Sequence, residues 1–231
     1  EEVGVAPVLD RAEVGANLQD HLDLFTICEA TGPHSYDRYA RPLWAALAGL
    51  RYLVSRTGPV ASSLFETGGF WYADPDARSP DIQLHLGLGT GIESGVAAMP
   101  NGGVTLNACY LRPRSRGTVR LTSADPAAPP AIDPNYWADP RDREMSLEGL
   151  KLAQRIMAQP PLAPFILAER LPGPDVRSEA DYIRFACENS KTSHHPAGTC
   201  RMGADADAVV DPRLRVNGVA GLRVADASIM P

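Results

Sequence analysis

The chain has 231 residues, 44% of them hydrophobic, which is enough to fill the core of a large domain. Its net charge of −6 is spread along the sequence without a run of Lys and Arg, so a nucleic acid is not expected as a partner. No apolar run approaches the roughly 20 residues needed to cross a bilayer, and we expect no membrane span.

The four cysteines are far apart and form no CxxC pair. Neither a structural zinc site nor a disulfide framework is indicated, and a reducing compartment fits best. We therefore expect a cytoplasmic location. Because the chain begins with Glu1 rather than Met, we interpret it as an internal piece of a longer protein.

Residues 42–54 carry Leu and Val at helical spacing, and Gly58-Pro59 ends the pattern, which predicts a helix with one buried face. Residues 81–88, 104–111 and 118–122 alternate like strands. The short polar link between the last two strands, RPRSRG, predicts that they form a hairpin.

The stretch SADPAAPPAIDPNYWADP contains five prolines, and we interpret it as a surface connector. Helices are predicted for residues 139–159 and 178–189, the second opened by a capping-box pair, Ser178 and Asp181. Strands clustered in the middle of the chain with helices around them predict an α+β fold with a large antiparallel sheet backed by helices.

Glycines in LHLGLGTGIESG, residues 84–95, follow a predicted strand as in a dinucleotide-binding turn. That fingerprint requires a helix directly after the glycines and an acidic residue about 20 positions later. Here Pro100 interrupts the chain and Asn107 stands near the place of the acid, so we interpret the stretch as a glycine-rich loop.

The stretch SHHPAGTCRMG places His194 and His195 before a proline. Adjacent side chains on an extended segment point to opposite sides, so a shared metal ion is not expected, and the chain has no GxSxG motif of a serine hydrolase. Pro196 favours an extended backbone at His195, and Gly198 permits a sharp bend. An imidazole held in such a loop, with an ordinary pKa of about 6.5, can accept a proton from an alcohol. A histidine that only hydrogen-bonds within its loop is equally consistent with the residues alone.

HHPAGTCRMG, followed by VVDPRLRVNGVAGLRVADASIMP, closely resembles the C-terminal signature of the glucose–methanol–choline (GMC) oxidoreductases. EVGANLQDHL resembles the segment that leaves the family's flavin domain, and YLRPRSRGTVRLTSADP with PAIDPNYW resembles its substrate-domain sheet. The resemblance extends over practically the whole chain. It implies an FAD-dependent enzyme that oxidises alcohols.

The resemblance also implies a division of the chain. Residues 1–22 would leave the Rossmann-like FAD domain, residues 23–190 would form the substrate-binding domain, and residues 191–231 would carry the catalytic loop back to the FAD domain. The family's FAD-binding glycine fingerprint is not in this sequence, nor is its second catalytic His or Asn. We therefore expect the remainder of the same enzyme to be its partner, and the chain alone to be inactive.

The resemblance assigns roles to particular residues. His195 would be the base that takes the hydroxyl proton while a hydride passes to flavin N5. Glu66 and His85 resemble substrate-pocket residues of the choline-oxidising members, and the implied substrate is a primary alcohol of choline-like or aliphatic type. Asp226 and Ala227 in VADAS resemble residues whose backbone approaches FAD. No metal is implied.

Four alternatives stay open. The chain could be a flavin-free binding module derived from the same fold, or part of a lyase of the GMC family. Glu66 could hydrogen-bond a neighbouring loop instead of facing a cationic substrate, and His85 could be solvated.

Overall fold

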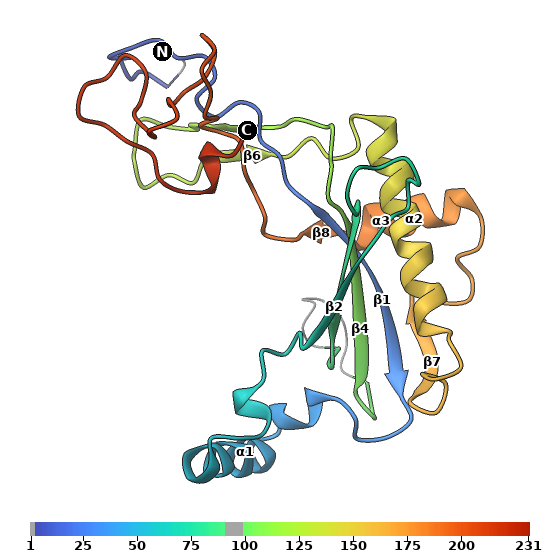
Figure 1. Cartoon of the computed structure of the whole chain (residues 1–231). Helices are drawn as coiled ribbons and strands as arrows, with labels where there is room; N and C mark the ends of the chain where they lie inside the picture. The colour runs from blue at the N-terminus through green and yellow to red at the C-terminus, as the bar shows by residue number, and fades with distance from the viewer. Residues whose placement is uncertain (1–2, 91–98) are drawn as a thin grey trace. The chain divides into compact units, whose positions relative to one another are not determined.

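The computed structural model describes residues 3–90 and 99–231, and the chain forms two compact units (Figure 1). Unit 1 consists of Glu1–Leu22, Arg112–Arg143 and Thr192–Pro231, and unit 2 of Asp23–Leu111 and Glu144–Lys191. The chain passes from one unit to the other after residues 22, 111, 143 and 191. The assignment of these parts to an FAD domain and a substrate domain stays a prediction.

Unit 2 contains a sheet in which β2 (Thr67–Trp71), β3 (Ile82–Gly87), β4 (Gly103–Tyr110), β1 (Leu22–Ala30) and β7 (Ile166–Leu171) follow one another in space. Neighbouring strands on this path are antiparallel, and β8 (Lys191–Thr192) also pairs with β1. The expected α+β class with an antiparallel sheet is confirmed. The central strand β1 is buried along its length but was not predicted, because its polar residues interrupt any regular alternation.

Helix α2 (Pro140–Met157) covers one face of this sheet and confirms the helix predicted for residues 139–159. The core beneath it joins helix and strand side chains: Ile82, Leu84, Leu106, Ala108, Met145, Leu152, Ala153 and Met157. Gly149 lies at the closest approach, since a Cβ there would be 3.4 Å from both the Ala108 Cβ and the Ile82 Cδ1 atoms. The absence of a side chain at Gly149 lets the helix axis come near the sheet.

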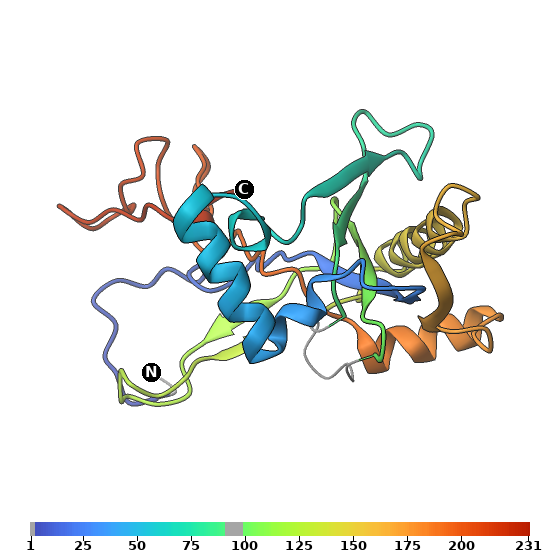
Figure 2. The same cartoon turned by 90° about the horizontal axis from the view of Figure 1, so that it is seen from below.

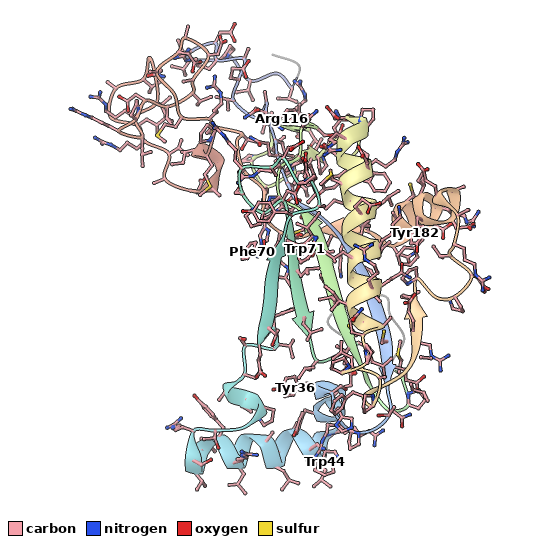
Figure 3. All side chains as sticks on the ribbon, turned by 45° about the vertical axis from the view of Figure 1, so that its right-hand side comes forward. Tyr36, Trp44, Phe70, Trp71, Arg116 and Tyr182 are labelled. Atoms are coloured by element: carbon pink, nitrogen blue, oxygen red, sulfur yellow. The ribbon has the colours of Figure 1, made fainter. Side chains whose placement is uncertain are left out.

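Helix α3 (Glu179–Asn189) begins with the predicted capping box. The Ser178 hydroxyl accepts from the Asp181 backbone N–H at 3.2 Å, and the Asp181 carboxylate accepts from the Ser178 N–H at 3.0 Å. From α3, the Tyr182 hydroxyl donates to the Gln154 Oε1 atom of α2 at 2.7 Å, and Tyr182 lies beside α2 in Figure 3. The two helices are thus joined by a side-chain hydrogen bond as well as by the sheet.

Helix α1 (Pro42–Ser55) forms where the spacing predicts it, between the short 3-10 turns η1 (Tyr36–Ala40) and η2 (Pro59–Ala61). The prediction of a buried face is wrong, because only Ala48 is buried. Figures 1 and 2 show that α1 stands beyond the ends of the strands, and most of its large apolar side chains are exposed. Trp44, labelled on α1 in Figure 3, instead packs under the Arg38 guanidinium, with 4.1 Å between the Cζ atom and the ring centre.

The predicted hairpin between the strands now labelled β4 and β5 (Thr118–Arg120) is wrong. β4 pairs with β1 and β3, and β5 pairs with β6 (Ala131–Asp133) in unit 1. The link leaves the sheet because the buried Asp142 carboxylate accepts the backbone N–H groups of Arg114 and Ser115, the shortest bond being 2.7 Å. The proline-rich stretch that we interpreted as a connector also contains the short strand β6. Its prolines are compatible with this strand because β6 pairs only with β5 and is not a central strand.

The glycine-rich loop of residues 84–95 is described only as far as Thr90, since residues 91–98 lie outside the described part of the chain. Its first residues complete β3, and Thr90 is buried. The Thr90 backbone N–H donates to the Asp37 carboxylate at 3.0 Å. The interpretation of this stretch as a glycine-rich loop, and not as a dinucleotide-binding turn, stays a prediction.

We expect Ile82→Ala to lower the free energy of unfolding by about 2–5 kcal/mol, because it leaves a cavity between α2 and the sheet. Leu167→Ala, at a side chain that is 55% exposed in β7, is the matched control and should cost about 0.5 kcal/mol or less. Chemical denaturation of the protein that carries this chain measures both. Similar losses for the two variants would contradict the assignment of Ile82 to the core.

Candidate active site

In unit 1, the histidine loop runs antiparallel to residues 15–21. Gln19 and Ala197 exchange both backbone hydrogen bonds, at 2.9 and 2.8 Å, and the Ser193 N–H donates to the His21 carbonyl at 2.9 Å. The Gly15 N–H donates to the Thr199 carbonyl at the far end, also at 2.9 Å. The loop that carries His195 is therefore held along its length by a segment more than 170 residues earlier in the chain.

Gly198 allows the two segments to come this close. Its φ of 93° lies in the left-handed region, and a Cβ there would be 2.5 Å from the Asn17 carbonyl oxygen. A side chain would therefore push the loop away from its partner. This is the bend that the sequence predicts after His195, and its structural reason is close backbone contact with Asn17.

The carboxylate of Asp20 links three stretches of unit 1. Asp20 is 8% exposed, and its Oδ1 atom accepts the backbone N–H of His195 at 3.0 Å. Its Oδ2 atom accepts the hydroxyl groups of Tyr136 and Thr192. One buried carboxylate thus satisfies three donors and fixes the main chain at His195.

The imidazole of His195 lies on the exposed side of the loop, against the ring of His21. Their Nδ1 atoms are 3.2 Å apart, and the two rings are perpendicular. The position of His195 is therefore set twice, at its backbone by Asp20 and at its ring by His21.

His194 has a left-handed backbone, with φ 61°, and its N–H donates to the Thr192 hydroxyl at 2.8 Å. Its side chain lines a different space from the His195–His21 contact, namely a cavity of about 680 Å³ within unit 1. The two adjacent histidines thus serve different surfaces, as their spacing on the chain indicates.

The walls of this cavity are mostly apolar, and they include Asp226 and Ala227. Its other lining residues are Leu18, Asp20, Val119, Ile132, Pro134, Tyr136, Thr192, His194, Pro196, Ala197, Thr199 and Ser228. A cavity of this size and apolar character, with a few polar groups, is typical of a site for a cofactor or a small molecule. Asp226 and Ala227, the predicted flavin contacts, therefore border this cavity, and their contact with FAD stays a prediction.

Asp226 begins the turn η3 (Ala227–Ile229), and its carboxylate accepts the Ser228 N–H at 2.8 Å. The hydrogen bonds from Ser228 lower the pKa of the Asp226 carboxyl below its usual value. The Cys200 N–H donates to the Ser228 carbonyl at 2.8 Å, so the turn is attached to the end of the histidine loop.

Glu66 lies in unit 2, just before β2, where the Tyr36 hydroxyl donates to its Oε1 atom at 2.9 Å (Figure 3 labels Tyr36). Hydrogen bonds from the Ser62 and Tyr36 hydroxyls lower the pKa of the Glu66 carboxyl. The exposed carboxylate is therefore negatively charged at neutral pH and is available to a cation. Both partners belong to neighbouring turns, Tyr36 to η1 and Ser62 to the end of η2, so a role in holding these turns stays open beside a role in substrate binding.

His85 lies in the middle of β3, opposite Gly68 on one side and Asn107 on the other. Leu84 belongs to the core under α2, so the alternation along the strand places His85 on the opposite face. The ring of Phe65 packs edge-on against the imidazole, with 6.3 Å between ring centres. Because Phe65 precedes Glu66, one short segment brings an aromatic ring and a carboxylate to this part of unit 2.

The C-terminal half of the chain matches the model of a known family. The model described as GMC oxidoreductase covers residues 113–231, more than half of the chain. This chain belongs to the GMC oxidoreductases. The resemblance found in its motifs is therefore confirmed, and so is the fold of the GMC substrate domain that the resemblance implies.

Two GMC relatives align with the whole of this chain. An alcohol dehydrogenase [acceptor] of Pseudomonas putida is 40% identical, and an oxygen-dependent choline dehydrogenase of Rhizobium johnstonii is 39% identical. The chain spans 42% of the length of each.

Solved structures of GMC enzymes also match nearly the whole of this chain and less than half of their own length. Pyridoxine 4-oxidase from Mesorbium loti is 32% identical with a TM-score of 0.81, over 99% of this chain and 41% of that one. A formate oxidase of Aspergillus oryzae RIB40, a variant described for its effect on FAD modification, is 27% identical with a TM-score of 0.90, over 100% of this chain and 45% of that one.

Two residues beside the GMC histidine loop, Asp20 and His21, were not singled out by the sequence analysis. Both occur in EVGANLQDHL, which was recognised only as a segment leaving the flavin domain. A His next to an Asp, in a chain with five histidines, is the only sequence signal for them. Within residues 3–90 and 99–231, no helix is long and apolar enough to cross a membrane, and no cluster of three potential metal ligands occurs.

We expect Asp20→Ala to lower the free energy of unfolding by about 2–5 kcal/mol, because three donors lose a buried charged acceptor. Asp10→Ala, at an exposed carboxylate of the same unit, is the control and should change it by about 0.5 kcal/mol or less. Denaturant unfolding of the full-length protein distinguishes them. An Asp20→Ala variant as stable as the control would show that the hydrogen-bond network contributes no stability.

Proposed function

We propose that this chain is part of an FAD-dependent alcohol oxidoreductase and that His195 is its base. Family membership and the alcohol- and choline-oxidising relatives support the reaction class. The observation that carries the residue assignment is the double restraint on an exposed imidazole, with Asp20 on its backbone and His21 on its ring. A loop histidine with no chemical role needs no such restraint.

In the proposed reaction, the imidazole of His195 accepts the hydroxyl proton of the alcohol as the carbinol C–H bond is broken, and the product is a carbonyl compound. Removing the proton makes the oxygen electron-rich and promotes departure of the hydride from carbon. A rigidly held base is important because proton transfer requires the donor and acceptor atoms to be within hydrogen-bond reach. The hydrogen bonds of Asp20 and His21 provide that rigidity.

FAD is the proposed cofactor, and Asp226 and Ala227 would contact it from the wall of the apolar cavity. When bound, FAD supplies the acceptor for the hydride that leaves the carbinol carbon. The rest of the FAD site would come from the remainder of the enzyme, since the chain spans 42% of its curated relatives. In the same proposal, residues 1–22 and 191–231 belong to the FAD domain.

Glu66 and His85 are the proposed substrate-pocket residues, and the charge of Glu66 favours a choline-like alcohol. Its two hydroxyl partners stabilise the ionised carboxylate. A quaternary ammonium offers charge compensation without needing a hydrogen bond, and the neighbouring Phe65 and Tyr36 rings offer faces that such cations favour. A neutral primary alcohol would gain nothing from that charge.

We expect His195→Ala to slow flavin reduction by alcohol about 10²–10⁴-fold, as for the loss of a positioned base. Stopped-flow absorbance of the full-length, FAD-loaded enzyme measures this step alone. His34→Ala, at a histidine of unit 2 whose ring contacts Phe165, is the control and should reduce FAD at the wild-type rate. Equally fast reduction in His195→Ala would refute the role of the base.

We expect Glu66→Gln to raise KM for choline about 10-fold or more, because the variant keeps the shape of the side chain and removes its charge. KM for 3,3-dimethylbutanol, the neutral isostere of choline, should change little. The measurement is a paired determination of kcat/KM for both alcohols in wild type and variant. Equal losses for the two alcohols would remove the choline-like assignment and leave the oxidation of an alcohol in place.

A further inference from the structure

The contact between His21 and His195 has a consequence for the protonation of both rings. Their Nδ1 atoms are 3.2 Å apart, which is hydrogen-bond distance, and the bond requires that one of the two nitrogens carries a proton while the other offers a lone pair. A neutral imidazole carries one N–H. The bond therefore couples the tautomers of the two histidines.

Two assignments satisfy this bond. If His21 donates, His195 carries its proton on Nε2 and has no lone pair there. If His195 donates from Nδ1, its Nε2 atom has the lone pair that a base needs. Only the second assignment lets His195 accept a proton at Nε2, the nitrogen on the side of the ring away from His21.

The segment that carries His21 is hydrogen-bonded to the segment that carries His195. Its carbonyl accepts the Ser193 N–H at 2.9 Å, and the preceding residue is the buried Asp20. Gln19, two residues before it, exchanges two backbone hydrogen bonds with Ala197. His21 is half-buried while His195 is exposed, so His21 is the more enclosed member of the pair, and its Nδ1 atom restricts the orientation of the His195 ring.

We propose that His21 is a positioning residue that accepts the Nδ1–H of His195 and thereby makes Nε2 of His195 the proton acceptor. This inference rests on the proposed role of His195 as base. When Nε2 takes the alcohol proton, His195 becomes an imidazolium that still donates from Nδ1 to His21. Because the donor is then charged, the hydrogen bond strengthens as the reaction proceeds and stabilises the product of proton transfer.

Three further titratable groups lie near the pair, namely Asp20, Tyr136 and His194. Asp20 accepts from the His195 backbone and from the Tyr136 hydroxyl, and His194 lines the cavity. Asp20 therefore fixes the main chain at His195, whereas His21 contacts its ring. In this proposal, His21 therefore determines the tautomer of His195, and Asp20 determines the position of its backbone.

The test uses two variants of the full-length, FAD-loaded enzyme that differ in one property. His21→Leu keeps a branched side chain but offers no lone pair, and His21→Asn places an amide oxygen near the former Nδ1 atom. We expect flavin reduction to slow about 10–100-fold in His21→Leu, the loss of one charge-assisted hydrogen bond, and to recover to within about threefold of wild type in His21→Asn. His34→Leu, in unit 2, is the control and should reduce FAD at the wild-type rate.

A third variant keeps the proposal testable if His21→Leu fails to fold. In His21→Asp a carboxylate faces His195, which favours the imidazolium, so the limb of the kcat/KM–pH profile that reports the base should move to higher pH. A role in stability alone would lower the amount of active enzyme without moving that limb. An unmoved limb in His21→Asp would overturn the proposal.

A double-mutant cycle separates this inference from the proposed function. If His21 acts through His195, adding His21→Leu to His195→Ala should cause no further slowing of flavin reduction. Additive losses would overturn the inference. A slow His195→Ala beside an unimpaired His21→Leu would refute only the role of His21, whereas an unimpaired His195→Ala would refute the proposed function itself.

Discussion

The buried carboxylate of Asp20 is the interaction on which the geometry of unit 1 depends. Asp20 lies in one stretch of the chain and accepts hydrogen bonds from Tyr136 in a second stretch and from Thr192 and the His195 backbone in a third. A buried carboxylate is costly unless its oxygens are hydrogen-bonded, so the favourable arrangement is the one in which all three stretches meet. The position of His195 follows from that requirement, because its main-chain N–H is one of the donors.

In unit 2, one face of the sheet forms the core under α2, and the other face carries polar side chains. α2 covers one face with Met, Leu and Ala side chains, and the close approach at Gly149 makes this contact dense. The side chains of His85 and Asn107, which are paired across β3 and β4, point to the other face. Because alternate residues of a strand face opposite sides, a strand can contribute to the core and to a pocket at once.

Sequence reasoning predicted the features that depend on neighbouring residues and failed for features that depend on contacts between distant residues. α2 and α3 were predicted close to their observed bounds, since helical spacing and the Ser178 capping box are local signals. The buried face of α1 and the hairpin after β4 were not correct, because both depend on what lies opposite the element in space. The central strand β1 was missed for a different reason, because polar residues such as Asp23 and Thr26 interrupt any regular alternation along it.

The sequence by itself determined the family and the fold class, because these follow from ordered motifs, and through the family resemblance it predicted His195 as the base. Only the tertiary structure decided what holds that histidine. Its ring contacts His21, 174 positions earlier, and its backbone is bonded to Asp20. Nothing in the local sequence of either segment encodes that contact. It forms only when the two segments pair and Asp20 is buried against His195 and Tyr136.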